Sequence, residues 1–247
     1  WCDESPEAIH ALPPTASNRK YYRIKSRNYT AIGVHNPNLK ENQAFISMTR
    51  FFMSQRIRVP EIYLSDLEND MYLLEALGDK PLFSFILEQS NHSKDSSELK
   101  KVLKNTLKEL ARIQVMGGKR MDFSICYPYE CFSQDSILWD LNYFRKQFLD
   151  QVGIAYHPEK LSSDFQQFAD FIMQADNDYL MYRDFQSRNI MLHRNTLYFI
   201  DYQGSRRGPL QYDVASFLFQ ARAALAEHIR EEMLEYYLEI AEMLTPI

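Results

Sequence analysis

Three polar side chains in the last third of the chain have types and a spacing that could carry out chemistry on phosphate groups. Asn189 follows Asp184 by five residues, and Asp201 ends the second apolar run after Asn189. Carboxylate and amide oxygens are the hard ligands that Mg²⁺ prefers, and Mg²⁺ neutralises the crowded oxygens of a phosphoryl group during its transfer. Asp and Asn are also common in turns, where they bond local backbone N–H groups, so a single pair at this spacing is weak evidence by itself.

The neighbouring residues make the pattern more specific. Arg183 precedes Asp184, an apolar run follows Asn189, and a second apolar run leads directly into Asp201 and Tyr202–Gln203–Gly204. Asp-x-x-x-x-Asn is the spacing of the catalytic loop of protein kinases, whose Asp accepts the proton of the attacking hydroxyl and whose Asn binds magnesium, while a later Asp holds the metals. The pattern therefore predicts a site for phosphoryl transfer.

The chain resembles the aminoglycoside phosphotransferase and choline kinase superfamily here and in three other segments. Residues 208–218 read GPLQYDVASFL, which is similar to the Gly-Pro-x-x-Tyr-Asp stretch of that superfamily. Two segments resemble its bacterial N-acetylmuramate/N-acetylglucosamine kinases, the anomeric sugar kinases of cell-wall recycling: PTASNRKYYRI (14–24) and ILWDLNYFRKQFLDQVG (137–153). The resemblance covers most of the chain, and its nearest branch is the sugar kinases.

The resemblance implies a role for each residue of the predicted site. Asp184 matches the catalytic base, Asn189 a metal ligand and Asp201 the principal metal ligand, so ATP and Mg²⁺ are the implied nucleotide and metal. Asp213 matches a residue that supports the catalytic loop. Its simpler structural role would be to cap the helix that it starts or to accept backbone N–H bonds.

Contacts to the nucleotide and to the acceptor are implied in the same way. The segment before the first hairpin lies where kinases cover the phosphates, and backbone groups at the hinge between the lobes would meet the adenine. The nucleotide-binding candidates are Ser17, Asn18, Arg19, Lys20, Glu75, Ala76 and Leu77. The acceptor-binding candidates are Trp139, Asp140, Arg183 and Gln203. A Trp is more often a core anchor than a platform for a sugar ring, so both roles stay open for Trp139.

Glycine and lysine are both missing from places where kinases often use them. The chain has seven glycines, and their positions exclude the dinucleotide fingerprint and the P-loop. Ser17 and the backbone amides after it would then replace glycines as phosphate donors. The superfamily usually has a strand Lys for the nucleotide phosphates, but TAIGVHN (30–36) offers only His35. The sequence leaves open which basic residue supplies this charge: Arg19, Lys20, Arg23 or Lys25.

Runs typical of β-strands dominate the first 77 residues. Tyr21–Ile24 and Tyr29–Val34 are rich in aromatic and β-branched residues on either side of a polar break, which predicts a hairpin. Residues 61–67 and 71–77 predict two further strands. Residues 41–57, with apolar side chains at helical spacing, predict one amphipathic helix.

Helical patterns dominate from residue 78 onwards. Asp95 and Glu98 predict a capping box for a helix that ends at Gly117–Gly118. The other predicted helices span residues 135–151, 163–175 and, as one bent helix or two, 213–245. Three short strands are expected among them, at Tyr179–Tyr182, Asn189–His193 and Leu197–Asp201. His193, which closes the second of these strands, is interpreted as a turn residue.

The composition excludes several classes of protein. The chain has 247 residues, 45% of them hydrophobic and 25% charged, which is typical of an ordered globular protein. Its net charge of -5 lacks the cationic surplus of a broad nucleic-acid surface. No apolar run reaches the length of about 20 residues that a transmembrane helix needs, and the N-terminal residues are too polar for a signal peptide. Three cysteines without metal-ligand spacing fit a reduced compartment, so a cytoplasmic location is expected.

These observations predict an α+β, protein-kinase-like fold with two lobes. Residues 1–77 would form a β-rich nucleotide-binding lobe, and residues 78–247 a helical catalytic and acceptor-binding lobe, which the resemblance implies is truncated. The expected function is ATP- and Mg²⁺-dependent phosphoryl transfer to a hydroxyl of a small molecule. The branch resemblance favours a sugar or amino sugar, and an aminoglycoside or amino alcohol comes next.

One interpretation from a different class competes with the enzyme. A non-catalytic kinase-like module could bind a nucleotide or a partner protein as a regulatory part of a longer polypeptide, and the missing strand Lys keeps this interpretation open. The presence of Asp184, Asn189 and Asp201 together argues against it. In either case we expect no nucleic-acid partner and no membrane partner, and the resemblance leaves room for an additional domain beyond the C-terminus.

Overall fold

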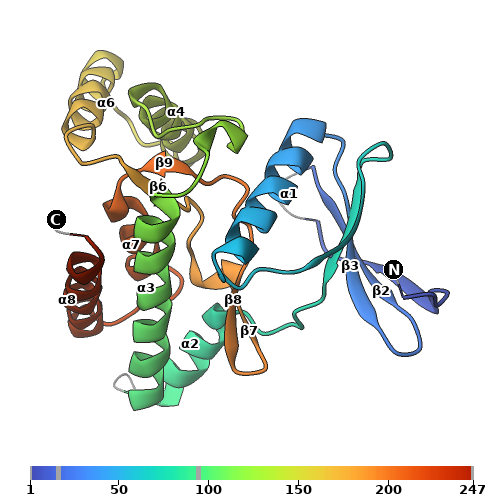
Figure 1. Ribbon diagram of the computed structural model, residues 1–247. Helices are drawn as coiled ribbons and strands as arrows, with labels where there is room; N and C mark the ends of the chain where they lie inside the picture. Colours follow the sequence, from blue (N-terminus) through green and yellow to red (C-terminus); the bar gives the residue numbers. More distant parts are fainter. Residues whose placement is uncertain (1, 15–17, 93–95, 246–247) are drawn as a thin grey trace.

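The computed structural model describes residues 2–14, 18–92 and 96–245. Figure 1 shows a β-sheet formed by the N-terminal residues on one side of the molecule and a group of helices on the other. The chain passes from the sheet to the helices after β5 (Met71–Glu75). The expected β-rich N-terminal part and helical C-terminal part are therefore confirmed.

The N-terminal sheet of the described chain has five antiparallel strands in the order β1-β2-β3-β5-β4. They are β1 (Ala8–Ala11), β2 (Lys20–Lys25), β3 (Thr30–His35), β4 (Ile62–Asp66) and β5. The predicted hairpin is confirmed as β2 and β3, with Tyr21 opposite Val34. Strand β1 was not predicted, because this short edge strand is mostly exposed and has no alternation of apolar and polar residues.

Helix α1 (Leu39–Ser54) lies between the sheet and the C-terminal part (Figure 1). The side chain of Asn38 caps its N-terminus by accepting a backbone N–H bond. Phe45 of this helix stacks on Tyr72 of β5, with ring centroids 5.0 Å apart, and on Tyr202, with centroids 5.2 Å apart. One buried aromatic cluster thus joins the sheet to the segment that follows Asp201, so the two parts of the molecule share a core.

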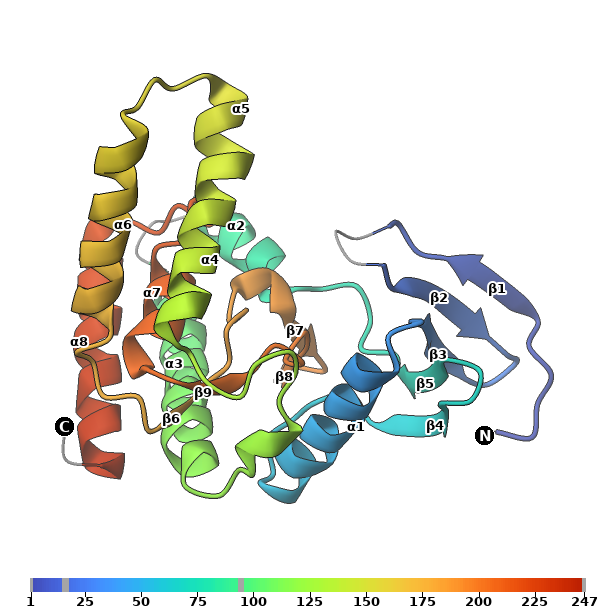
Figure 2. The same ribbon diagram turned by 90° about the horizontal axis from the view of Figure 1, so that it is seen from above.

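Helices build most of the C-terminal part. They are α2 (Leu82–His92), α3 (Ser97–Gly118), α4 (Gln134–Phe144), α5 (Asp150–Val152), α6 (Pro158–Ile172), α7 (Leu210–Leu218) and α8 (Glu227–Leu244). A π-helical turn at Arg145–Leu149 joins α4 to α5, and the three form one run at the place predicted for a helix at 135–151. Figure 2 shows this run and α6 side by side, extending beyond the rest of the molecule.

The starts of α3 and α6 differ from the predicted ones. The N-cap of α3 is Ser96, whose hydroxyl accepts the backbone N–H of Leu99, so the predicted capping box is wrong, and Asp95 itself lies outside the described residues. Helix α6 begins at Pro158, five residues earlier than predicted, because the fixed φ of proline suits the first turn of a helix.

The C-terminal region predicted as one bent helix or two consists of two, α7 and α8. Helix α7 begins at Leu210, three residues before the predicted start. Asp213 therefore lies inside the first helical turn and is not the cap of this helix. No helix in the described part of the chain is long and apolar enough to cross a membrane.

Two short antiparallel strand pairs lie among the helices. They are β6 (Tyr179–Met181) with β9 (Arg206–Gly208), and β7 (Ile190–His193) with β8 (Thr196–Phe199). Strand β9 was not predicted, since its sequence is Arg-Arg-Gly. A Cβ atom on Gly118 would lie 2.9 Å from the backbone nitrogen of Leu180, so this glycine allows the end of α3 to pack directly on β6.

Candidate functional site

The fold brings Asp184, Asn189 and Asp201 together. Nδ2 of Asn189 donates to the backbone oxygen of Asp184 at 2.9 Å and to Oδ2 of Asp201 at 3.3 Å. Pairing of β7 with β8 places Asn189 and Asp201 at the same end of the hairpin, where the N–H of Ile200 donates to the carbonyl of Asn189 at 3.0 Å. Because Nδ2 of Asn189 is used in these bonds, its Oδ1 is the atom that could bind a metal.

Two residues of this site have unusual backbone conformations. Arg183 has φ +77° and Asp201 has φ +66°, in the left-handed region that residues with a Cβ seldom adopt. Such conformations persist only where the surrounding structure fixes them, and they are concentrated at functional sites. Here they lie directly before Asp184 and at the predicted metal ligand itself.

Asp213 fixes the loop that carries the predicted base. Its buried carboxylate accepts the backbone N–H groups of Tyr182 at 2.7 Å and of Arg183 at 2.8 Å. Gln114 of α3 donates to the same carboxylate at 3.2 Å, and the hydroxyl of Tyr237 in α8 donates to Gln114 at 2.6 Å. Burial raises the pKa of Asp213 to about 7, against the opposing effect of these hydrogen bonds. Helices α3, α7 and α8 therefore position the loop jointly.

The carboxyl group of Asp184 lies in an environment that increases its basicity. Burial raises its pKa, and the like charge of Asp201 raises it further. The nearby guanidinium groups of Arg183 and Arg188 act in the opposite direction. A carboxylate with a raised pKa accepts a proton more readily than an ordinary aspartate, which is the property needed in a general base.

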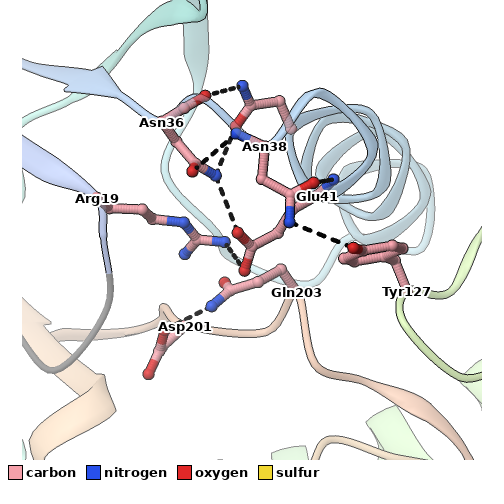
Figure 3. Close-up of polar contacts among 8 residues, drawn as sticks. Arg19, Asn36, Asn38, Glu41, Tyr127, Asp201 and Gln203 are labelled. Atoms are coloured by element: carbon pink, nitrogen blue, oxygen red, sulfur yellow. Dashed lines mark hydrogen bonds and ion pairs between the residues drawn. The ribbon is translucent and has the colours of Figure 1, made fainter.

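Arg19 places a buried positive charge beside the predicted metal ligands. This residue is 5% exposed, and its Nη2 lies 2.7 Å from Oε1 of Glu41 in α1. Asn36 donates to the other oxygen of the same carboxylate at 2.9 Å. Figure 3 shows this group next to Asp201 and Gln203, and Nε2 of Gln203 donates to Oδ1 of Asp201 at 2.8 Å. Figure 3 also shows the N-cap residue of α1 reaching a tyrosine of the C-terminal part.

The other candidates before the first hairpin lie in different surroundings. Ser17 lies outside the described residues, and Asn18 and Lys20 are exposed. Arg23 donates from Nη1 to Asp79 at 3.0 Å, and its guanidinium is thereby bonded to the chain that follows β5. Among these basic residues, Arg19 is the one whose charge faces the predicted metal ligands.

The hinge residues differ in which of their backbone groups are already bonded. The N–H of Glu75 donates to the carbonyl of Glu61 at 2.9 Å as part of the sheet. Nδ1 of His193 lies 3.0 Å from the carbonyl oxygen of Leu77, so His193 ties the hinge to β7 and is more than a turn residue. Within the described residues, the backbone N–H groups of Ala76 and Leu77 make no hydrogen bond.

A cavity of about 340 Å³ lies beside Asp184. Trp139 lines this cavity, is 55% exposed and stacks on Tyr143, with ring centroids 5.4 Å apart. The interpretation of Trp139 as a core anchor is therefore wrong, because this side of α4 faces the cavity and solvent. The indole presents a flat apolar surface of the kind on which a sugar ring can stack.

The remaining acceptor candidates form part of the same region. Arg183 and Gln203 line the cavity, whereas Asp140 does not line it and accepts from Nη2 of Arg183 at 2.8 Å. Asp140 therefore orients Arg183. Within the described chain, Oε1 of Gln203 is buried and has no hydrogen-bond partner.

Sequence reasoning missed two charged residues that the structure places at the site. Glu41 lines the cavity and is the counterion of Arg19. Arg206 also lines the cavity, from β9. Glu41 looks like an ordinary acidic residue in the first turn of a helix, and Arg206 is one of two adjacent arginines. Their sequence context therefore does not indicate that either belongs to a functional site.

The donor set fits a magnesium ion that is also bound by a nucleotide. Among the described residues, no group of three or more His, Cys, Asp or Glu side chains could hold a metal by itself. Mg²⁺ in kinase sites, however, takes only one or two protein carboxylates and completes its shell with phosphate oxygens and water. The Asp201 carboxylate and Oδ1 of Asn189 supply hard oxygen ligands of this kind, and a cation there would relieve the repulsion between Asp201 and Asp184.

Comparisons with known proteins agree with this geometry. A model of the phosphotransferase enzyme family matches residues 8–245. The N-acetylmuramate/N-acetylglucosamine kinase of Pseudomonas aeruginosa is 22% identical over 219 residues, which cover 87% of this chain and 60% of that protein. The chain thus spans about 60% of the length of the curated relatives it matches.

Solved structures share the fold at low sequence identity. Choline kinase LicA from Streptococcus pneumoniae has a TM-score of 0.66 at 14% identity, covering 97% of this chain and 82% of that one. An aminoglycoside phosphotransferase with bound ADP has a TM-score of 0.64 at 13% identity, covering 97% and 81%. The predicted two-part, kinase-like fold is confirmed by this likeness.

Proposed function

The chain belongs to the phosphotransferase enzyme family, and from this premise we propose that it transfers a phosphoryl group from ATP to a hydroxyl of a small molecule. The observation that carries the proposal is the hydrogen bonding of Asn189 to both Asp184 and Asp201, which gathers a base and two oxygen ligands at one point beside a cavity. In this proposal residues 1–77 form the nucleotide-binding lobe and residues 78–247 the catalytic and acceptor-binding lobe.

In the proposed mechanism Asp184 orients the acceptor hydroxyl and takes its proton. The acceptor oxygen forms a bond to the terminal phosphorus of ATP while the bond from that phosphorus to the bridging oxygen breaks, and ADP leaves. Asp201 and Asn189 would hold Mg²⁺, which supplies charge neutralisation on the phosphates. The raised pKa of Asp184 and its position in the cavity wall support its assignment as the base.

Arg19 supplies the positive charge that the missing strand Lys would give to the nucleotide phosphates. Protein kinases use an ion pair between a strand Lys and a helix Glu for this purpose. The pair of Arg19 with Glu41 has the same composition of charges and lies beside Asp201. Its arginine directly precedes β2, and its glutamate belongs to α1. The backbone N–H groups of Ala76 and Leu77 are the proposed adenine contacts, because no other described group bonds them.

The proposed acceptor is a sugar or amino sugar. The relatives from two Pseudomonas species are named for N-acetylmuramate and N-acetylglucosamine, which supports this class. The exposed ring of Trp139 and the buried amide oxygen of Gln203 line a cavity that could hold one sugar ring. Aminoglycosides and amino alcohols are the acceptors of second choice.

Incubation of the purified chain with γ-labelled ATP, Mg²⁺ and a panel of acceptors tests the proposal. The panel contains sugars, amino sugars, aminoglycosides and amino alcohols, with Asp184→Asn as the matched inactive variant. We expect label on a sugar or amino sugar with the wild type only. Nucleotide binding without transfer to any acceptor would favour the regulatory module, and label on the amino alcohols or aminoglycosides alone would replace the proposed acceptor class.

A further inference from the structure

The wall of the cavity beside Asp184 contains two neighbouring arginines. Pairing of β6 with β9 places Arg206 opposite Met181, two residues before Arg183, and both arginines line the cavity. Two positive charges so close together are unexpected, because the guanidinium groups repel each other in a region of low dielectric constant. The repulsion affects Arg206, since burial and then the charge of Arg183 lower its pKa.

Arg206 has no counterion of its own. The residue is 3% exposed, its Nε donates to the carbonyl of Gly204 at 3.1 Å, and its guanidinium lies 5.3 Å from the ring centroid of Tyr129. Among the described residues, no carboxylate forms an ion pair with this guanidinium, and its Nη1 has no hydrogen-bond partner. Asp140, an acid that does act on the pKa of Arg206, already accepts a hydrogen bond from Arg183.

Arg183 has unused bonding capacity as well. Asp140 accepts from its Nη2, but within the described chain its Nη1 is buried without a partner. Leaving a buried charged donor without a partner destabilises a folded protein, and such donors in native proteins are normally satisfied by a protein group, water or ligand. Two guanidinium groups with unpaired donors, side by side at a cavity, thus have the chemistry of an anion site.

We propose that Arg206, together with Arg183, binds a carboxylate carried by the acceptor. This proposal rests on the proposed function, which it deepens: the acceptor class becomes sugars or related polyols that bear an acid group. Gln203, whose Oε1 is also buried without a partner in the described chain, would accept a hydrogen bond from a hydroxyl of the same molecule. The cavity would then bind the carboxylate through the arginines and one hydroxyl through Gln203, while Asp184 faces the hydroxyl that reacts.

A phosphate of the nucleotide is the other anion that could meet these arginines. Arg19 is proposed to meet the phosphates, and Asn189 and Asp201 to hold the Mg²⁺ on them. None of these three described residues lines the cavity. The cavity is also walled by Trp139, which offers a surface to a sugar ring. We therefore assign the two arginines to the acceptor.

Binding of matched acids and neutral sugars without nucleotide tests this assignment. The probes are N-acetylmuramate against N-acetylglucosamine, which differ by a lactyl ether that ends in a carboxylate, and glucuronate against glucose, which differ by a carboxylate in place of a hydroxymethyl group. By calorimetry we expect the wild type to bind at least one acid tenfold or more tightly than its neutral counterpart. Arg206→Gln should remove this preference and leave the affinity for the neutral sugar within threefold, since a charge-assisted bond to a carboxylate is lost.

Arg207→Gln is the matched control. Arg207 is the next residue of β9, is exposed, and lies over the ring of Phe123, away from the cavity. Its replacement should leave both affinities unchanged. If Arg206→Gln does not fold, Arg206→Lys keeps the charge, loses the forked geometry, and should reduce the preference for the acid without abolishing it.

The outcomes separate the two proposals. Equal affinity for acid and neutral sugar in the wild type, or a preference that survives Arg206→Gln, would overturn the carboxylate site and leave phosphoryl transfer intact. Loss of ATP affinity in Arg206→Gln with unchanged acid binding would assign the arginines to the nucleotide and overturn the inference. Binding of the acid with no transfer to any acceptor would overturn the proposed function and leave the carboxylate site standing.

Discussion

Nη2 of Arg19 lies 2.7 Å from Oε1 of Glu41, so that the segment entering β2 and the first turn of α1 are joined beside Asp201 by an ion pair whose arginine is buried. A residue outside the usual third strand thereby brings a positive charge to the predicted phosphate site. This relationship distinguishes Arg19 from the other basic residues near the first hairpin, which are exposed or bonded elsewhere.

Arg19→Ala should weaken the binding of ATP by about 10- to 100-fold, because one charge-assisted contact to the phosphates is lost. Lys20→Ala is the matched control: Lys20 is adjacent and exposed, and its replacement should change the dissociation constant by less than threefold. Calorimetry on both variants, with melting curves to verify folding, makes the comparison. Equal losses in the two variants would contradict the specific role of Arg19.

Asp184→Asn should bind ATP with Mg²⁺ almost as well as the wild type, yet turn over about 10²- to 10⁴-fold more slowly, because the amide cannot accept the proton of the acceptor hydroxyl. Single-turnover transfer and the melting temperature are measured on one preparation. A variant that melts early but transfers phosphate at the wild-type rate would show that Asp184 only stabilises its loop.

Asp201→Asn should remove most of the dependence of nucleotide affinity on Mg²⁺, since this carboxylate is the proposed principal charged ligand of the metal. Asp178→Asn, at an exposed aspartate outside the cavity wall, is the control and should keep the wild-type dependence. Titrations of ADP with and without Mg²⁺ give two affinities for each of the three proteins. A wild type that binds ADP equally in both conditions would contradict the metal assignment.

The rate should fall on acidification at a pH above the ordinary range of an aspartate, because Asp184 must be deprotonated to act and burial raises its pKa. Arg188 is exposed, and its charge lowers that pKa. Arg188→Gln should therefore move the acid limb of the kcat/KM profile to higher pH and leave the plateau rate unchanged. A limb that stays in place, or moves to lower pH, would contradict this electrostatic account of Asp184.

The free energy of unfolding should contain a contribution from Asp213 that falls as the pH rises from about 4 to 7. Burial raises the pKa of this group from 3.8 to about 7 in the folded protein, so the folded state holds a proton that the unfolded state has released. A difference of about three units between the folded and unfolded pKa values corresponds to a contribution of about 4 kcal/mol to the free energy of unfolding. Stability curves at pH 5 and 7 should therefore differ less in Asp213→Asn than in the wild type, and parallel curves would contradict the raised pKa.

Local sequence signals determined the parts of the fold and the candidate site that depend on neighbours along the chain. The hairpin of β2 and β3 follows from aromatic and β-branched residues on either side of a polar turn. The grouping of Asp184, Asn189 and Asp201 follows from a loop and a short hairpin that lie within 18 residues of sequence. In both cases the pattern and its structural consequence lie in the same segment.

Helix ends and edge strands were predicted less well. Ser96 rather than Asp95 caps α3, and β1 and β9 were missed. Caps compete among adjacent polar residues whose propensities are similar. A short edge strand is stabilised by its neighbour in the sheet more than by its own composition, so its sequence carries little signal.

Tertiary structure alone decided which charges meet at the site. Arg19 and Glu41 are 22 residues apart, Asp140 and Arg183 are 43 apart, and His193 reaches Leu77 across 116 residues. Nothing in the segment around Arg206 distinguishes it from Arg207, yet strand pairing buries one at the cavity and exposes the other. The sequence specifies which groups are available, but their pKa values, counterions and unsatisfied donors arise only when distant segments exclude water from the same place, because burial and proximity set the strength of electrostatic interactions.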